Sequence, residues 1–274
     1  MRPNEAPETS YLVRPGGRVT YEVDGTGPLV VLVPGMGDLR AAYRYLAPVL
    51  RDRGYRVVAV DLRGHGGSDA TFPSYGDAET AGDVIALVEE LVGPAVVVGN
   101  SMGAAAGVLV AAQRPELVRA LVLIGPFVRD REANALEILL QRVAMAPAWA
   151  AAAWRSYLPK LYAGRRPDDF DAYRNQVAAS LRLPGHAKAF SRTTRSSHNA
   201  AESHLADVSV PTLVVMGEED PDFSDPAAEA AWIAERLHAE VVMVPEAGHY
   251  PQSQQPALTV DALSRFLEGL NGGV

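Results

Sequence analysis

The stretch that decides the fold is AVVVGNSMG, residues 95–103. Its first part, residues 95–98, is a short apolar run rich in valine, which is typical of a buried strand. The run ends in Gly-x-Ser-x-Gly, and the small residues 104–107 that follow favour a helix. A strand, a tight turn and a helix in this order lift the serine side chain clear of the sheet, and the glycines avoid a backbone clash there. The segment therefore predicts Ser101 as a nucleophile at the apex of the turn.

An acid and a histidine follow the serine in chain order, each in a loop after a later apolar strand. Asp220 follows the strand expected at 212–216, and His249 follows the strand expected at 241–244. A serine hydroxyl becomes a nucleophile when an imidazole takes its proton and a buried carboxylate holds the other ring nitrogen. The predicted catalytic set is therefore the serine, His249 and Asp220, with Asp222 of the same acidic loop as the alternative acid.

Five other histidines compete for the role of base, and their positions argue against them. His65 lies in the glycine-rich loop 61–68 after an earlier strand, where a structural role is expected. Three more fall in the irregular middle of the chain, and one ends a helix-like stretch. Only His249 follows a late strand.

Acyl transfer also needs backbone N–H groups that receive the negative oxygen of the tetrahedral intermediate. The amide of Met102, the residue after the nucleophile, is one expected donor. The second is expected in the loop 34–37, directly after the apolar strand at 29–33. Met36 is the predicted donor there, because Pro34 has no N–H and the flanking glycines let the backbone turn inward.

These segments together resemble the α/β-hydrolase superfamily, and the resemblance extends from about Tyr11 to Leu270. Residues 99–103 look like its nucleophile elbow, and residues 61–68 look like a loop shared by esterases, perhydrolases, epoxide hydrolases and C–C hydrolases. Serine instead of aspartate at the nucleophile position indicates the serine branch. The resemblance implies an α/β fold: a mostly parallel, eight-stranded sheet flanked by helices, with a helical cap insertion.

One departure concerns the loop after the first parallel strand. Members of this group usually carry His-Gly there, whereas this chain has Pro34-Gly35. A backbone donor remains available, but the sequence leaves open how the loop is braced.

The chain divides by its pattern into a flexible arm, a core in two parts and an insertion. The arm is expected at residues 1–10, the core at 11–126 and 209–274, and the cap at 127–208. Core helices are expected at 39–53, 78–92, 102–113, 226–238 and 255–270, between strands that begin with an antiparallel pair near 11–23 and continue at 29–33, 56–60, 95–98, 120–124, 212–216 and 241–244.

The cap segment has no convincing strand, and its proline and glycine breaks predict four helices at 132–145, 147–162, 167–181 and 185–195. In the resembling family such an insertion covers the nucleophile and shapes the pocket. The predicted substrate-binding residues are accordingly Gly35, Phe127, Trp154 and Tyr157.

Composition excludes several classes of function. The formal net charge of −8 argues against a nucleic-acid partner, and the absence of cysteine excludes a thiol nucleophile and cysteine-ligated zinc. No stretch is apolar enough for a membrane span or a secretory leader, so we expect a cytoplasmic protein without a membrane partner. No metal and no cofactor are expected, and the oligomeric state stays open between monomer and homodimer.

The hypothesis from the sequence is a serine hydrolase that cleaves a small carboxylic ester or related acyl compound through an acyl-enzyme. A C–C bond or lactone hydrolase on the same triad is the first alternative. A ligand-binding receptor that keeps the hydrolase scaffold is an alternative from another class.

Overall fold

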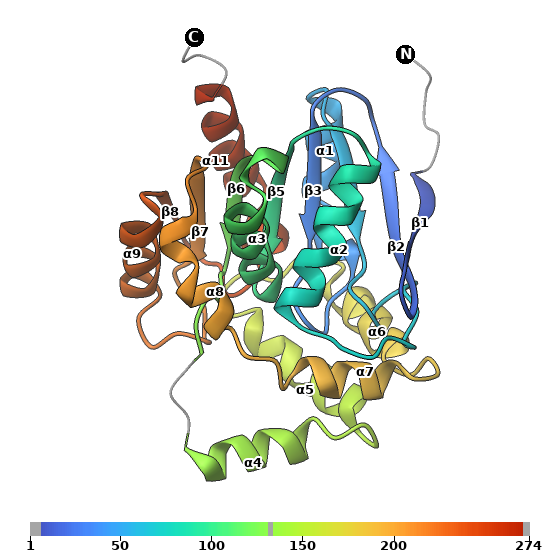
Figure 1. Cartoon of the computed structure of the whole chain (residues 1–274). Coiled ribbons are helices and arrows are strands. Elements are labelled where there is room, and N and C mark those ends of the chain that lie inside the picture. Colours follow the sequence, from blue (N-terminus) through green and yellow to red (C-terminus); the bar gives the residue numbers. More distant parts are fainter. Residues whose placement is uncertain (1–6, 131–133, 271–274) are drawn as a thin grey trace.

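One twisted sheet runs through the centre of the molecule, with helices on both of its faces (Figure 1). The computed structural model describes residues 7–130 and 134–270 of the chain. The eight strands are β1 (Glu8–Arg14), β2 (Gly17–Asp24), β3 (Leu29–Val33), β4 (Arg56–Val60), β5 (Ala95–Asn100), β6 (Val118–Ile124), β7 (Thr212–Gly217) and β8 (Glu240–Val244).

The strand order is β1-β2-β4-β3-β5-β6-β7-β8. β2 pairs antiparallel with both β1 and β4, and every other pair in the sheet is parallel. The predicted α/β class with a mostly parallel eight-stranded sheet is confirmed. β1 begins at Glu8, so the last three residues of the predicted arm 1–10 belong to a strand instead, and residues 1–6 lie outside the described part.

The parallel strands are apolar throughout because helices cover both faces of the sheet. Alternate residues of β3 show this: Val31 and Val33 join one apolar cluster, and Val30 and Leu32 join the other. The first cluster is covered by α2 (Asp77–Glu90), α3 (Met102–Gln113) and α9 (Pro226–Leu237). The second is covered by α1 (Leu46–Asp52) and α11 (Pro256–Gly269), with the short α10 (Pro251–Gln254) beside it.

The helix predicted at 39–53 is wrong as a single element. A 3-10 turn at Arg40–Tyr43 comes first, and α1 begins only at Leu46. Arg44 and Tyr45 interrupt the segment between them. The Arg44 guanidinium makes two contacts of 2.6 Å to the carboxylate of Asp169 in the insertion, so this break ties the core to the insertion.

In the described part of the segment between β6 and β7, which we call the insertion (residues 127–208), there are five α-helices. They are α4 (Ala135–Ala144), α5 (Ala150–Leu161), α6 (Phe170–Ser180), α7 (His186–Thr193) and α8 (Asn199–Ser203). The first four match the predicted helices with shorter ends, although residues 131–133 lie outside the described part. The fifth was not predicted. Its Ala201, with Leu205 just beyond it, joins the core cluster of α2 and α3.

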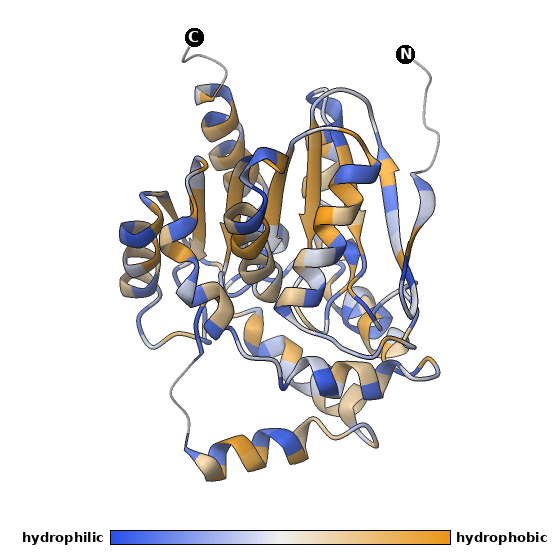
Figure 2. Cartoon of the chain, in the orientation of Figure 1, coloured by the Kyte–Doolittle hydropathy of each residue, from blue (hydrophilic) through white to orange (hydrophobic). Residues whose placement is uncertain are grey.

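Helix α4 differs from its neighbours because none of its residues is buried. It stands away from the rest of the molecule at the lower edge (Figure 1), and it carries both apolar and charged residues on its surface (Figure 2). Its N-terminus is nevertheless well formed, since Asn134 and Glu137 make a reciprocal capping box. Among the described residues, no helix is long and apolar enough to cross a membrane.

Candidate active site

The turn after β5 has the backbone that a serine at its apex requires. Ser101 has φ 55° and ψ −121°, a conformation that L-residues rarely adopt. A Cβ on Gly99 would lie 2.2 Å from the Gly103 carbonyl oxygen, and a Cβ on Gly103 would lie 2.3 Å from the Val33 carbonyl oxygen. Glycine is therefore required on both sides of Ser101, because strand, turn and helix cross too closely for a side chain.

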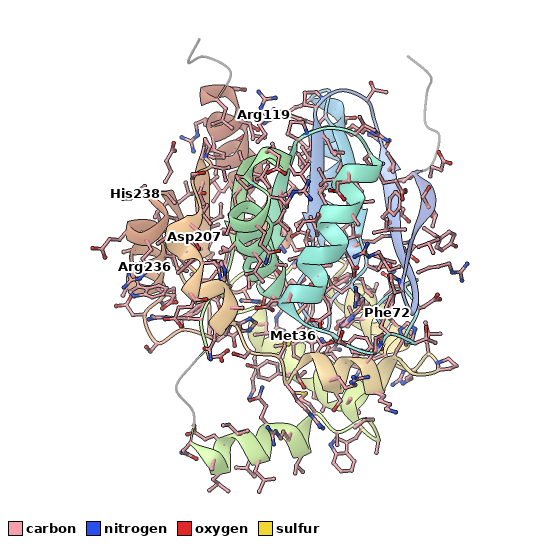
Figure 3. All side chains as sticks on the ribbon, in the orientation of Figure 1. Met36, Phe72, Arg119, Asp207, Arg236 and His238 are labelled. Atoms are coloured by element: carbon pink, nitrogen blue, oxygen red, sulfur yellow. The ribbon has the colours of Figure 1, made fainter. Side chains whose placement is uncertain are left out.

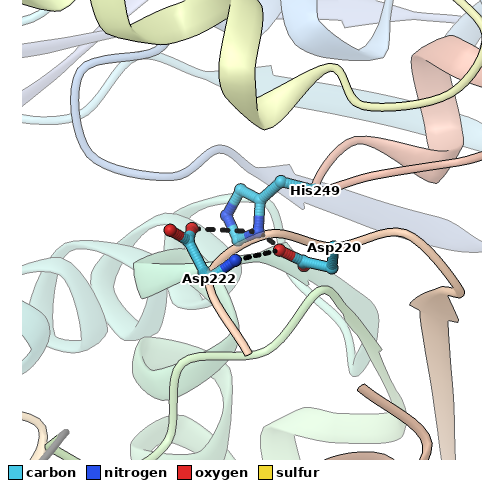
Figure 4. Close-up of side chains that lie close together, drawn as sticks. All are labelled: Asp220, Asp222 and His249. Atoms are coloured by element: carbon cyan, nitrogen blue, oxygen red, sulfur yellow. Dashed lines mark hydrogen bonds and ion pairs between the residues drawn. The ribbon is translucent and has the colours of Figure 1, made fainter. Parts of the chain in front are cut away.

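His249 and Asp220 form a buried pair at the carboxyl ends of β8 and β7. Nδ1 of His249 lies 2.8 Å from Oδ2 of Asp220 (Figure 4), and the two side chains are 3% and 0% exposed. A carboxylate can only accept, so Nδ1 carries a proton, and Nε2 is the acceptor nitrogen whenever the ring is neutral. This is the tautomer in which an imidazole can take a proton from a serine.

Asp222, the alternative acid, lies on the same side of the ring but farther away. Its Oδ2 is 3.6 Å from Nδ1 of His249, and its backbone N–H donates to Oδ1 of Asp220 at 3.1 Å. Donor atoms of these three residues lie within 4.8 Å of one another, a spacing at which one cation could also be held. The 2.8 Å hydrogen bond favours Asp220 as the acid that orients the ring.

The surroundings of His249 shift its affinity for a proton. Burial lowers its pKa, but the charge and hydrogen bond of Asp220 and the charges of Asp222 and Asp38 outweigh burial and raise the pKa to about 9. Three carboxyl groups from two loops therefore favour the protonated imidazole. A developing imidazolium during catalysis would be stabilised by the same groups.

Two contacts bring the serine turn and the histidine loop together. The side-chain amide of Asn100 donates to the His249 carbonyl at 3.1 Å and to the Ile124 carbonyl at 2.9 Å. Phe127 donates its backbone N–H to the Ser101 carbonyl at 3.4 Å, and its ring centroid lies 5.8 Å from that of His249. The three predicted catalytic residues thus come from loops at one edge of the sheet.

The loop after β3 lies directly against Ser101. A Cβ on Gly35 would be 2.8 Å from Cβ of Ser101 and 3.4 Å from its hydroxyl oxygen. The next residue, Met36, is half-buried between the core and the insertion helices α5 and α7 (Figure 3). Met102 is buried and is the first residue of α3, where a helix amide has no intrahelical acceptor. Both predicted oxyanion donors therefore belong to segments that adjoin Ser101, and their role as donors remains a prediction.

Gly37 shows how this loop is braced without the usual histidine before the first glycine. Its N–H donates to Nε2 of His65 at 2.9 Å, and its carbonyl accepts from the indole N–H of Trp154 at 2.7 Å. Nδ1 of His65 lies 2.9 Å from the Arg63 carbonyl, which fixes the neutral tautomer with the proton on Nδ1. The structural role expected for His65 is thus support of the loop next to Ser101.

His65 should make stability depend on pH. Burial lowers its pKa to about 4, so the folded state keeps the ring neutral while the unfolded state takes up a proton below pH 6.5. The contribution to stability is present above pH 6.5 and is lost as the pH falls toward 4, by about 3 kcal/mol in all. Chemical denaturation should therefore show a steeper loss of unfolding free energy over this range in the wild type than in His65→Gln. Equal slopes would contradict the assignment.

The insertion contributes two aromatic side chains from one face of α5. Trp154 is buried against the loop after β3, as its bond to Gly37 shows. Tyr157 is half-buried and donates its hydroxyl to Oδ1 of Asp222 at 3.1 Å. Their rings lie 5.7 Å apart. Of the predicted substrate-binding residues, Gly35 and Phe127 contact the serine turn. Trp154 and Tyr157 bind the neighbouring loops after β3 and β7. Contact with substrate remains a prediction for all four.

Two polar residues near the site were not predicted. Asn100 ends the apolar strand β5, and a polar side chain in the middle of the serine motif was the available signal. Asp38 is fully buried, contacts the Tyr173 hydroxyl and accepts from the Leu39 amide. Burial raises its pKa to about 6 in spite of these two hydrogen bonds. The sequence pattern held no signal for Asp38, because Tyr173 belongs to the insertion.

Comparison with known proteins identifies the family of the chain. Residues 30–262 match the alpha/beta hydrolase family. The chain belongs to this family. It is 33% identical over 265 residues to the 2-(acetamidomethylene)succinate hydrolase of Mesorhizobium japonicum, which covers 92% of this chain and 93% of that protein.

Two further similarities concern other hydrolases of the family. A 3-oxoadipate enol-lactonase of Acinetobacter baylyi is 24% identical over 249 residues, which are 89% of this chain and 90% of the lactonase. The solved structure of a serine hydrolase involved in carbazole degradation superposes with a TM-score of 0.77 at 25% identity, over 96% of this chain and 99% of the other. The family to which this chain belongs is thus a family of hydrolases.

Proposed function

We propose that the protein is a serine hydrolase that cleaves a small carboxylic ester through an acyl-enzyme. The observation that carries the proposal is the buried bond between Nδ1 of His249 and Asp220, beside a serine held in a strained turn. A buried acid, a histidine held with a proton on Nδ1 and a serine at the apex of a tight turn are the parts that acyl transfer needs. The similarity to a serine hydrolase over nearly the whole chain supports the same choice.

Each residue then has a defined task. The Ser101 hydroxyl attacks the ester carbonyl carbon while Nε2 of His249 takes its proton, and the amides of Met36 and Met102 receive the negative oxygen. The intermediate expels the alcohol, which leaves with the proton from His249. Water, deprotonated by the same nitrogen, then cleaves the acyl-enzyme and releases the acid.

Charge around the site favours a neutral substrate. Asp38, Asp220 and Asp222 all act on His249 as negative charges, and like charges brought to the same site repel. We therefore expect neutral acyl esters to be cleaved in preference to carboxylated ones such as succinate derivatives.

A lactone or C–C bond hydrolase on the same residues is the second candidate. The enol-lactonase relative is the observation that favours it, and ring opening of a lactone uses the same attack by serine. Product analysis separates the candidates: an ester hydrolase releases an alcohol and an acid, whereas a lactonase forms a single hydroxy acid.

Labelling with a fluorophosphonate tests the proposal without knowledge of the substrate. An activated serine displaces fluoride and becomes phosphonylated, so peptide mass mapping should place the adduct on Ser101. Ser203 provides a matched comparison, because its hydroxyl lies 3.2 Å from Nδ1 of His204 but is exposed. Ser203→Ala should label like the wild type and Ser101→Ala should not label. An adduct elsewhere, or none, would reject the proposal.

A further inference from the structure

Helix α5 contacts two loops of the candidate active site, the loop after β3 and the loop after β7. Trp154 holds the Gly37 carbonyl in the loop after β3, at 2.7 Å, and Tyr157 holds Asp222 in the loop after β7, at 3.1 Å. These residues are three positions apart, so they lie on the same face of one helix. The helix is itself fixed, since Trp154 is buried against Phe190 of α7, with ring centroids 5.2 Å apart.

Asp222 is placed to act on the histidine ring. Its two oxygens have different partners: Oδ1 accepts from the Tyr157 hydroxyl, and Oδ2 lies 3.6 Å from Nδ1 of His249. Its backbone N–H also supports Asp220 at 3.1 Å. Rotation of the Asp222 carboxylate away from the ring would require loss of the bond to Tyr157.

We propose that Asp222 is a positioning residue for His249, and that Tyr157 of α5 holds Asp222 in place, so that the insertion takes part in orienting the base. This inference rests on the proposed function. The sequence predicted that Tyr157 contacts substrate, whereas this inference gives its hydroxyl the task of holding Asp222. The other charged groups that face the ring are Asp220 from the same loop and Asp38 from the loop after β3.

The rate of phosphonylation of Ser101 against pH is a suitable measurement, because it reports the neutral fraction of His249 and needs no substrate. Asp222→Asn removes one negative charge near the ring, so the midpoint of the profile should move to lower pH by about one unit. Tyr157→Phe leaves the charge but frees the carboxylate, so a smaller shift in the same direction is expected. Tyr11→Phe, a change of the same kind at a half-exposed tyrosine on β1, should leave the midpoint where it is.

The double variant Tyr157→Phe with Asp222→Asn decides whether one residue acts through the other. If it does, the double variant should have the same midpoint as Asp222→Asn alone, because the tyrosine then has no carboxylate to hold. Additive shifts of the midpoint, or single variants that keep the wild-type midpoint, would overturn the inference. The proposed function would still stand in that case if Ser101 is labelled. A wild type that is not labelled at Ser101 would overturn both.

Discussion

Replacement of Ser101 by alanine should lower the turnover of a short p-nitrophenyl ester by about 10⁴- to 10⁶-fold. The loss is this large because the histidine and the acid have no task without the nucleophile, so one change removes the function of the whole set. Steady-state kinetics on the purified variant measures the effect. Thermal unfolding of the same sample should be nearly unchanged, since alanine keeps the Cβ and the backbone of the turn.

Ser101→Gly provides a control for this experiment. Ser101 has a φ of 55°, which glycine adopts without strain, so this variant should be as inactive as Ser101→Ala and no less stable. Retention of more than about a tenth of the wild-type turnover in either variant would exclude a nucleophilic serine, because removal of a triad member costs at least about 10⁴-fold.

The second large effect is expected at Asp220. Asp220→Asn should lower turnover by about 10⁴-fold, because an amide that donates to Nδ1 stabilises the wrong tautomer of His249. Asp222→Asn should cost about tenfold or less, since its carboxylate lies 3.6 Å from Nδ1 and is not the direct acceptor. Both variants replace an oxygen by an amide nitrogen of equal size, so they form a matched pair.

Kinetics at several pH values, under conditions where both variants are folded, gives the comparison. If Asp222→Asn lost as much turnover as Asp220→Asn, the two acids would share the task of orienting the ring. If Asp222→Asn lost more, the assignment of Asp220 as the acid would be wrong.

Much of the fold follows from short stretches of sequence. The strand β5, the turn and α3 were predictable because apolar residues, glycines and small residues succeed one another within 13 positions, so local geometry alone decides the structure. The break between Arg40–Tyr43 and α1 was not predictable, because Arg44 leaves the helical pattern to bind Asp169, which lies 125 positions away. Helix α8 was missed for a similar reason: it is short and is held by its packing on α3.

In the candidate site, too, local features could be predicted from the sequence and long-range contacts could not. Asp220 and His249 could be predicted because each follows a parallel strand, and the carboxyl ends of parallel strands meet at one edge of a sheet. The contacts of Trp154 with Gly37 and of Tyr157 with Asp222 could not, since they depend on where the insertion lies against the core. Patterns within an element carry no information about such distant pairs.

Helices α4 and α5 are neighbours in the chain, but we expect them to differ in how well they tolerate substitutions. A change at Trp154 disturbs the backbone next to the nucleophile, whereas α4 buries none of its side chains. Random substitutions should therefore accumulate in α4 with little damage to the fold or to the chemistry.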